Sequence, residues 1–529
     1  MKKAPLIIAL IILSAVTTGQ TGDDITRKGL NSITENVLKS QLTFLSSDWM
    51  EGRETGEKGE YMSADYIASM LQYMGVAPGG DFGSGGGRQG QRERSYFQNF
   101  QLLKSSQGEN QTMAVITTTG SAARTTHFAY NLDYSVRNSA AGMEIDAPVI
   151  FVGYGIRSGK INDFTKKDVK GKVILRVSGL PASARAAGGS EAAAMNASKD
   201  VAARELGAIA VLEVNPVTIV LATGAERRDF MNMSPSEGRI SSGRPSASLS
   251  IPQPSVAAQL PRITVSARLA NEILEGAGFT IADFAAQADT RQLLQYPEVT
   301  GKKVKLVSSV NSSLINVRNV IGIIEGEKSD EIIVVGAHYD HLGIGNGYIW
   351  NGADDNGSGT VGVMTLARAV MATGKKPEKT IVFALWTAEE KGLIGSRYWV
   401  DNPTVPLENI RMHINFDMIS RYIADDQPNA VTMTYTDSHP LFREITEKNI
   451  AKFGIDIVPD YQPSDNPPGG SDHRSFVAKG IPIMRFKPGH REEYHTPADD
   501  VTTLDWDIME KVIKITFANL WELANSDWK

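Results

Sequence analysis

Residue types that can bind a metal recur in the second half of the chain, each group at a predicted strand end or in a loop. The first group is AHYDH (337–341), which follows the apolar run Glu331–Gly336. Residues two apart on an extended chain point to the same side, so His338 and Asp340 face together. A metal-binding histidine needs its second ring N–H held, commonly by a carboxylate. His338 supported by Asp340 meets that need, although a solvated turn explains an isolated His-x-Asp equally well.

Two further groups supply carboxylates. NGADDNGSG (351–359) places two aspartates in a glycine-rich turn before a predicted helix, which suits either a helix entrance or a bridging carboxylate on a tight loop. The apolar run Thr380–Trp386 leads to Glu389 and Glu390. Because neighbouring side chains on an extended backbone diverge, these two glutamates cannot share one role. One can bind a metal while the other faces a substrate.

The last two groups complete a candidate ligand set. Asp417 interrupts the apolar run INFDMI (414–419), and a lone carboxylate there is costly unless it is paired or bound to a metal. His495 lies in a proline-containing turn, YHTPADD (494–500). The chain has no cysteine, so any metal must be held by His, Asp and Glu. Two histidines and three or four carboxylates form the ligand set of a two-metal hydrolase.

The elements that must position these groups alternate between strands and helices from about residue 314. The pattern predicts strands at Glu331–Gly336, Thr380–Trp386, His413–Ile419 and Ile481–Phe486, and helices at Gly359–Ala372, Pro440–Phe453 and Trp506–Asn525. Such alternation is typical of an α/β fold with helices on both faces of the sheet. Ligand groups then collect at the carboxyl ends of the strands.

Composition and charge exclude several classes of protein. The 529 residues are 41% apolar and 22% charged, which rules out collagen, a coiled-coil rod and a mainly disordered chain, and suggests two or three domains. The formal charge is −6, with 54 basic and 60 acidic residues and no long basic run, so we expect no nucleic-acid partner.

The sequence predicts an N-terminal targeting segment and an inserted domain. Two lysines precede the apolar stretch Pro5–Val16, which is about 18 Å long as a helix and too short for a bilayer core of about 30 Å. Residues 1–20 are therefore predicted to be a cleaved signal peptide, and the mature protein to be periplasmic or secreted without a membrane anchor. Residues 140–290 carry short strands but no catalytic cluster, which predicts a domain inserted into another one, made of residues 21–139 and 291–529.

These motifs together resemble the co-catalytic di-zinc aminopeptidase family, which contains aminopeptidase Y, glutamate carboxypeptidase II and glutaminyl cyclase. The matching stretches are GAHYDHLG (336–343), NGADDNGSG (351–359), WTAEEKGLIGS (386–396), NFDMI (415–419), YHTPADD (494–500) and the opening segment LSSDWMEGRETGEKG (45–59). The stretch NDFTKKDVKGKVIL (162–175) resembles a protease-associated domain. The resemblance implies a mixed central sheet flanked by helices on both faces, with an inserted β-rich protease-associated domain.

The resemblance also implies roles for single residues. Two zinc ions per chain would be held by His338, Asp355, Glu390, Asp417 and His495. Asp355 would bridge the ions, with His495 and Glu390 completing one site and His338 and Asp417 the other. Glu389 matches the general base and Asp340 the carboxylate that supports the first histidine. The peptide bond between Asp355 and Asn356 is expected to be cis.

The implied function is that of a zinc-dependent aminopeptidase, which releases N-terminal residues from peptides through a metal-bridged hydroxide. Three alternatives stay open at this point. A glutamate-carboxypeptidase-like enzyme requires a cationic cleft, for which Arg397, Arg421 and Arg485 are candidates. A glutaminyl cyclase is a transferase with one zinc, and a non-catalytic binding protein on the same scaffold is expected to have lost ligands. The sequence leaves the side-chain preference and the oligomeric state open.

Overall fold

The structure is a computed structural model of the whole chain. It describes residues 22–528 except 84–92, 137–141, 159–160, 186–188, 216–246, 253–259, 290–295, 297–298, 346, 425, 488 and 490. The predicted signal peptide therefore lies outside the described residues. The chain divides into two compact units, the first made of residues 1–99, 318–344 and 348–529 and the second of residues 100–317 and 345–347.

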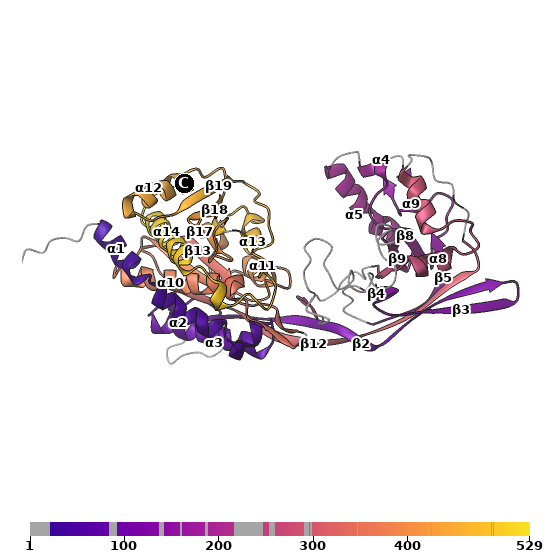
Figure 1. Cartoon of the computed structure of the whole chain (residues 1–529), viewed down its shortest axis with the longest axis horizontal. Coiled ribbons are helices and arrows are strands. Elements are labelled where there is room, and N and C mark those ends of the chain that lie inside the picture. Colours follow the sequence, from indigo (N-terminus) through magenta and orange to yellow (C-terminus); the bar gives the residue numbers. More distant parts are fainter. Residues whose placement is uncertain are drawn as a thin grey trace, which may run out of the picture. The chain divides into compact units, whose positions relative to one another are not determined.

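The first unit is built on a mixed sheet in the order β19-β18-β20-β17-β13-β16-β12 (Figure 1). Strands β16, β13, β17 and β20 run parallel, whereas β12 pairs antiparallel with β16 and β18 antiparallel with β20. The strand bounds are β1 (Ala77–Pro78), β13 (Lys328–His338), β14 (Gly343–Gly345), β15 (Tyr348–Trp350), β16 (Lys379–Trp386), β17 (Ile410–Phe416), β18 (Ala430–Tyr435), β19 (Val458–Pro463) and β20 (Ile483–Lys487).

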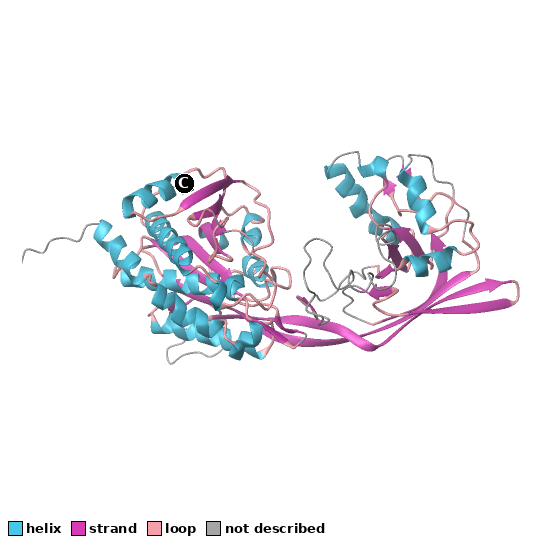
Figure 2. Cartoon of the chain, viewed as in Figure 1, coloured by secondary structure: helices cyan, strands magenta, loops and turns pink. Residues whose placement is uncertain are grey.

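Helices cover both faces of this sheet (Figure 2) because its central strands are apolar on both sides. On β13, Ile333 and Val335 join the core formed with α10 and α14, whereas Ile332 and Val334 join the core under α11 and α13. The helices are α1 (Gly22–Ser32), α2 (Glu35–Leu45), α3 (Lys58–Tyr73), α10 (Gly359–Ala372), α11 (Ile394–Asp401), α12 (Leu441–Phe453), α13 (His473–Val477) and α14 (Trp506–Ala524). None of the helices in the described residues is both long and apolar enough to cross a membrane.

This arrangement confirms the predicted α/β fold with a mixed, helix-covered sheet. The predicted strands and helices all form, with bounds shifted by a few residues at most. Strands β18 and β19 were not predicted from the sequence. The residues of β19 are mostly exposed and show no apolar run, and the buried β18 is interrupted by two threonines.

In the second unit, β5, β8, β9 and β11 run parallel, β4 is antiparallel to β11, and β12 is antiparallel to β5. Its strands are β2 (Phe97–Thr119), β3 (Ala122–Phe128), β4 (Tyr134–Val136), β5 (Met143–Phe151), β6 (Arg157–Ser158), β7 (Ile161–Asn162), β8 (Val173–Val177), β9 (Ala210–Val214), β10 (Ser248–Ser250), β11 (Arg262–Val265) and β12 (Lys302–Ile324). Its helices are α4 (Ala182–Arg185), α5 (Gly189–Glu205), α8 (Ala267–Leu274) and α9 (Ile281–Asp289).

The second unit reaches further along the chain, in both directions, than the predicted insertion of residues 140–290. The additional residues belong largely to β2, β3 and β12, whose sequence shows no change of texture at the boundary. Gln98, just before the chain leaves the first unit, lies beside Asn319, just after the chain returns to it. The Asn319 side chain donates a hydrogen bond to the Gln98 side chain at 2.9 Å. The assignment of this unit as a protease-associated domain stays a prediction.

Glu60 joins the N-terminal helix α3 to the central strands. Its carboxyl group accepts a hydrogen bond from the amide of Gly56 at 2.6 Å and from the hydroxyls of Tyr339 and Thr387, which follow β13 and β16. Burial raises the pKa of Glu60 to about 8, so the carboxyl group is largely protonated at neutral pH.

We predict that Phe383→Ala destabilises the first unit by about 3–5 kcal/mol, because Phe383 is fully buried in the centre of β16 and its removal leaves a cavity. All seven tryptophans of the chain lie in the first unit, so tryptophan fluorescence during urea unfolding reports on this unit alone. The control Val458→Ala, on the exposed edge strand β19, should change stability by less than about 0.5 kcal/mol. Equal effects of the two substitutions would contradict the predicted core.

A second prediction concerns pH and Glu60. The folded-state pKa of about 8 lies above the unfolded value, so the folded state binds more protons between about pH 4.5 and 8 and loses stability as the pH rises through that window. Glu60→Gln removes this loss. The unfolding free energy of the variant minus that of the wild type should therefore increase from pH 5 to pH 8, by on the order of 1–4 kcal/mol. A difference that does not change with pH would refute the assignment.

Candidate metal centre

The candidate site forms at the carboxyl ends of three parallel strands. β13 ends at His338, the chain after β16 carries Glu389 and Glu390, and Asp417 follows β17. The register places His338 opposite Trp386, so the two strand ends lie at the same edge of the sheet. This is the position that α/β topology favours for ligand groups.

The first cluster of donor atoms surrounds His338, which is almost fully buried. Its Nε2 atom lies 3.5 Å from Asp355 Oδ1 and 3.7 Å from Asp417 Oδ1. One atom from each of these three residues lies within 4.8 Å of the others. Burial alone would lower the pKa of His338, yet the charges of Glu389, Asp417 and Asp355 raise it well above its ordinary value.

The second cluster surrounds Glu390. His495 Nε2 lies 3.0 Å from Asp355 Oδ2 and 3.3 Å from Glu390 Oε2. His341 Nδ1 lies 2.9 Å from Glu390 Oε1, and His341, Asp355 and Glu390 also form a group with donor atoms within 4.8 Å. The sequence motifs gave His341 no ligand role, but the structure brings it into contact with Glu390. The Nε2 atom of His341 is buried and has no hydrogen-bond partner among the described residues.

Asp355 lies between the two clusters and presents one carboxylate oxygen to each histidine. The turn that carries it is held by Asp499, whose carboxylate accepts the amide N–H groups of Asp354 at 2.8 Å and Asp355 at 3.0 Å. The Asn356 side chain donates to the carbonyl of Phe416, at the end of β17, at 3.0 Å. The peptide bond between Asp355 and Asn356 is cis, which confirms the expectation from the sequence.

Asp340 connects the histidine strand with the glutamate strand. Its two carboxylate oxygens accept the amide N–H groups of Glu389 at 3.0 Å and Glu390 at 3.3 Å, and Oδ2 also accepts the Thr55 hydroxyl at 3.0 Å. His338 Nδ1 lies within hydrogen-bond distance of the backbone carbonyl of Asp340, at 3.2 Å, whereas the carboxylate Oδ1 of Asp340 is 3.7 Å away. Asp340 therefore orients the two adjacent glutamates as well as the histidine.

The adjacent glutamates differ in their electrostatic surroundings. Burial and the charge of Glu390 raise the pKa of Glu389 well above its ordinary value, against the opposing effect of His338. Burial would raise the pKa of Glu390 as well, but hydrogen bonds from His341 and His495 bring it well below its ordinary range. When the pKa values of two neighbouring carboxyl groups differ in this way, one group can transfer protons while the other stays ionised and binds a cation.

The donor set fits zinc. Four ligands at about 2.0–2.1 Å around a tetrahedral zinc ion lie about 3.3 Å from one another. The measured separations of 3.5 and 3.7 Å around His338 and of 3.0 and 3.3 Å around His495 are close to this value. Imidazole and carboxylate are also donors that zinc accepts. The seven residues predicted from the sequence thus all lie together, and the structure shows a geometry in which they can hold metal ions.

Arg53 supports the site from outside the strand ends, and the sequence analysis gave it no role. Its buried guanidinium donates to the carbonyls of Tyr339 at 2.9 Å, Asn351 at 2.7 Å and Gly352 at 2.8 Å. Burial lowers the pKa of Arg53 to about 10. The signal was present in the opening segment LSSDWMEGRETGEKG (45–59), which contains both Arg53 and Thr55.

Comparisons with known proteins point to one family. Residues 319–520 match the description "Peptidase family M28". Leucine aminopeptidase 2 of Arthroderma otae is 33% identical over 205 residues, which cover 37% of this chain and 39% of that protein. Leupeptin-inactivating enzyme 1 of Streptomyces exfoliatus is 34% identical over 166 residues, or 31% of this chain and 34% of that enzyme. The matched part of the chain thus spans about two fifths or less of these relatives.

Among solved structures, the aminopeptidase from Aneurinibacillus sp. strain AM-1 superposes with a TM-score of 0.57 at 18% identity, covering 95% of this chain and 97% of that chain. This likeness concerns the fold. The residues that build the two donor clusters, apart from the supporting Arg53 and Thr55, all fall within the matched segment. Residues 319–520 of this chain, which carry both donor clusters, are therefore similar to peptidase family M28.

Proposed function

We propose that the protein is an aminopeptidase that binds two zinc ions and removes N-terminal residues from peptides. The observation that carries this proposal is the position of Asp355. Its two carboxylate oxygens face two separate histidines, with Oδ1 3.5 Å from His338 and Oδ2 3.0 Å from His495. A bridging carboxylate of this kind serves two metal ions rather than one.

His338 and Asp417 would hold one ion, and Glu390 and His495 the other, with Asp355 shared. Zinc bound to these groups supplies Lewis-acid chemistry, because it polarises the scissile carbonyl and lowers the pKa of a nearby water. His341 and Asp340 would keep Glu390 and the histidine strand in position.

Glu389 is the group suited to move the proton. Its backbone amide is fixed by Asp340, and its side chain lies 3.9 Å from His338 Nε2, beside the first donor cluster. The ionised carboxylate of Glu389 can take a proton from the attacking water and return it to the leaving amine, and a raised pKa makes that carboxylate the stronger base. In this assignment Glu389 would transfer the proton, and the ionised Glu390 would bind a zinc ion.

The alternatives receive less support. A glutaminyl cyclase would need one metal, whereas Asp355 is shared here by two groups of donor atoms. A carboxypeptidase-like enzyme would need free cations for a substrate carboxylate. Of the three candidates, Arg421 already contacts Asp354 at 3.5 Å and donates to Thr503 at 3.0 Å, and Arg485 lies 3.3 Å from His473 Nδ1. A non-catalytic protein on this scaffold would be expected to lack ligands. The names of the relatives favour action at the amino terminus.

We further propose that residues 1–20 direct export and that residues 140–290 form a protease-associated domain that influences access of longer peptides. The charged start and short apolar stretch support export. N-terminal sequencing of the protein recovered from the periplasm or medium tests it, and an intact Met1 would refute cleavage.

Metal removal tests the two-ion proposal. A chelator should abolish peptide hydrolysis, and zinc should restore it with saturation at two ions per chain by elemental analysis. Asp355→Asn should lower the affinity for both ions and reduce turnover by more than about 100-fold. The control Asp401→Asn alters a half-exposed carboxylate that pairs with Lys479, and should leave metal content and activity unchanged. Saturation of the wild type at one ion would overturn the proposal.

The adjacent glutamates can be separated by substitution. Glu389→Gln keeps size and hydrogen bonding but cannot accept a proton, so kcat should fall about 10²–10⁴-fold while both zinc ions stay bound. Glu390→Gln replaces a charged ligand by a neutral one, so one zinc ion should bind more weakly. The exposed Glu447→Gln serves as the control. If Glu389→Gln lost zinc and Glu390→Gln kept both ions, the two roles would have to be exchanged.

A further inference from the structure

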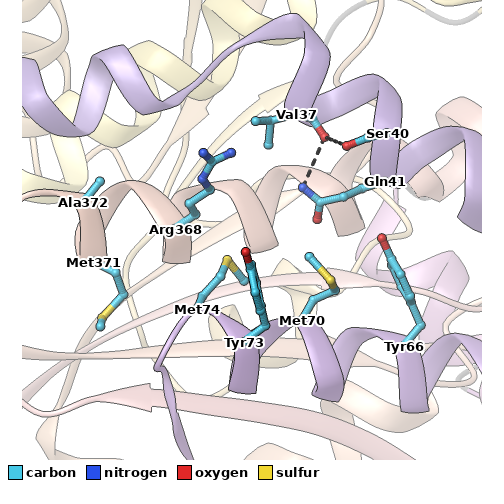
Figure 3. A pocket seen from close by; sticks show the side chains of 10 residues that line it. All are labelled: Val37, Ser40, Gln41, Tyr66, Met70, Tyr73, Met74, Arg368, Met371 and Ala372. Carbon is cyan, nitrogen blue, oxygen red and sulfur yellow. Dashed lines mark hydrogen bonds between the residues drawn. The ribbon is translucent and has the colours of Figure 1, made fainter.

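A second pocket lies in the first unit, between α2, α3 and α10. Its volume is about 820 Å³, within the range of small-molecule sites. Figure 3 shows the ten side chains that line it: Val37, Ser40 and Gln41 from α2, Tyr66, Met70 and Tyr73 from α3, Met74 directly after α3, and Arg368, Met371 and Ala372 from α10. The lining is aromatic and methionine-rich, and methionine adapts its shape to different apolar ligands.

Two polar groups in this pocket lack a partner. The side chain of Gln41 is only 5% exposed, and its Oε1 atom has no hydrogen-bond partner among the described residues. Its Nε2 atom donates to the carbonyl of Val37 at 3.2 Å, which turns the oxygen away from α2 and toward the pocket (Figure 3). A buried acceptor without a donor costs about 1–3 kcal/mol. The Oε1 atom itself has almost no accessible surface, so a ligand that donates a hydrogen bond here recovers that energy by displacing the side chains that cover the atom.

Arg368 supplies the second group. It is the single charged residue of α10, a helix that is otherwise apolar or small, and it is half-buried at the pocket wall. None of the ten lining residues is acidic. Within the described part of the chain, no carboxylate lies within ion-pairing distance of its guanidinium. The pocket therefore offers an uncompensated positive charge beside apolar surface.

We propose that this pocket binds the carboxyl end of an acylated apolar amino acid, such as the C-terminal residue of a peptide. The carboxylate would pair with Arg368, the amide N–H would donate to Gln41 Oε1, and the apolar side chain would pack on the methionines and tyrosines. Tyr73 is 84% exposed at the mouth of the pocket, so the ligand can enter from solvent. A simple fatty acid matches the charge and the apolar wall but has no donor for Gln41.

The pocket is separate from the metal centre. Arg368 and Met371 lie nine and twelve residues beyond Gly359, where α10 begins directly after the turn that carries Asp355, which is about 14–18 Å along the helix. Binding in the pocket therefore does not depend on the proposed peptidase function. It can be tested with ligands that an aminopeptidase cannot cleave.

The experiment uses the zinc-loaded full chain labelled with ¹³C-methyl methionine, and N-acetyl-Leu-Phe as the probe. The blocked amine prevents cleavage by an aminopeptidase, and the methyl signals of Met70, Met74 and Met371, assigned by single Met→Leu variants, report on this pocket alone. Their shifts should saturate with the probe. The C-terminal amide of the same probe should bind at least about tenfold more weakly, because it cannot pair with Arg368.

Two substitutions test the contributions of Arg368 and Gln41 to binding separately. Arg368→Gln should bring the affinity for the acid down to that for the amide, and Gln41→Met should weaken N-acetyl-Leu-Phe but not dodecanoate, which has no N–H. Arg443→Gln, an exposed arginine on α12, is the matched control and should bind as the wild type does. Unshifted methyl signals elsewhere show that each variant is folded. The proposal is overturned if the three methionine signals do not move, if acid and amide bind equally, or if dodecanoate binds as tightly as the peptide and Gln41→Met has no effect.

Discussion

Burial of several carboxylates around a few imidazoles is the constraint on which the first unit depends. Asp355, Glu390 and Asp417 are taken out of water at one edge of the sheet, where their mutual repulsion is poorly screened. Histidines and, in the proposed function, two zinc ions compensate that charge. Such a site is stable only if neighbouring groups hold every carboxylate in place, which explains the density of hydrogen bonds around it.

The supporting groups come from distant parts of the sequence. Arg53 holds the backbone after β13 and before the metal-binding turn, Asp499 holds that turn from the C-terminal side, and Asp340 fixes the glutamates. The sheet alone therefore brings the strand ends together, but the geometry of the site is determined by contacts between the N-terminal segment, the strand ends and the chain around His495.

Much of this could be predicted from the sequence. Strong apolar runs gave the central strands, and the polar residues that follow them gave the donor set, because both signals are local. Arg53 and Asp499 could not be found this way, since each acts on backbone groups that lie far away in the sequence. His341 was underestimated because its neighbours His338 and Asp340 already satisfied the motif, and only the fold shows its contact with Glu390. The extent of the second unit was hidden because its outer strands β2 and β12 continue into the first unit.

The first unit is made of chain segments that lie before and after the second unit in the sequence, and this order affects folding during synthesis. Helices α1, α2 and α3 are made first, but their packing partners α10 and α14 follow only after the entire second unit has been made. At about 5–20 residues per second, a ribosome needs on the order of 10–45 s to cross residues 100–317. The apolar faces of the early helices stay uncovered for that time, whereas the second unit, with a core of its own, can fold as soon as it emerges. The inserted part of the chain is thus expected to fold before the unit that surrounds it.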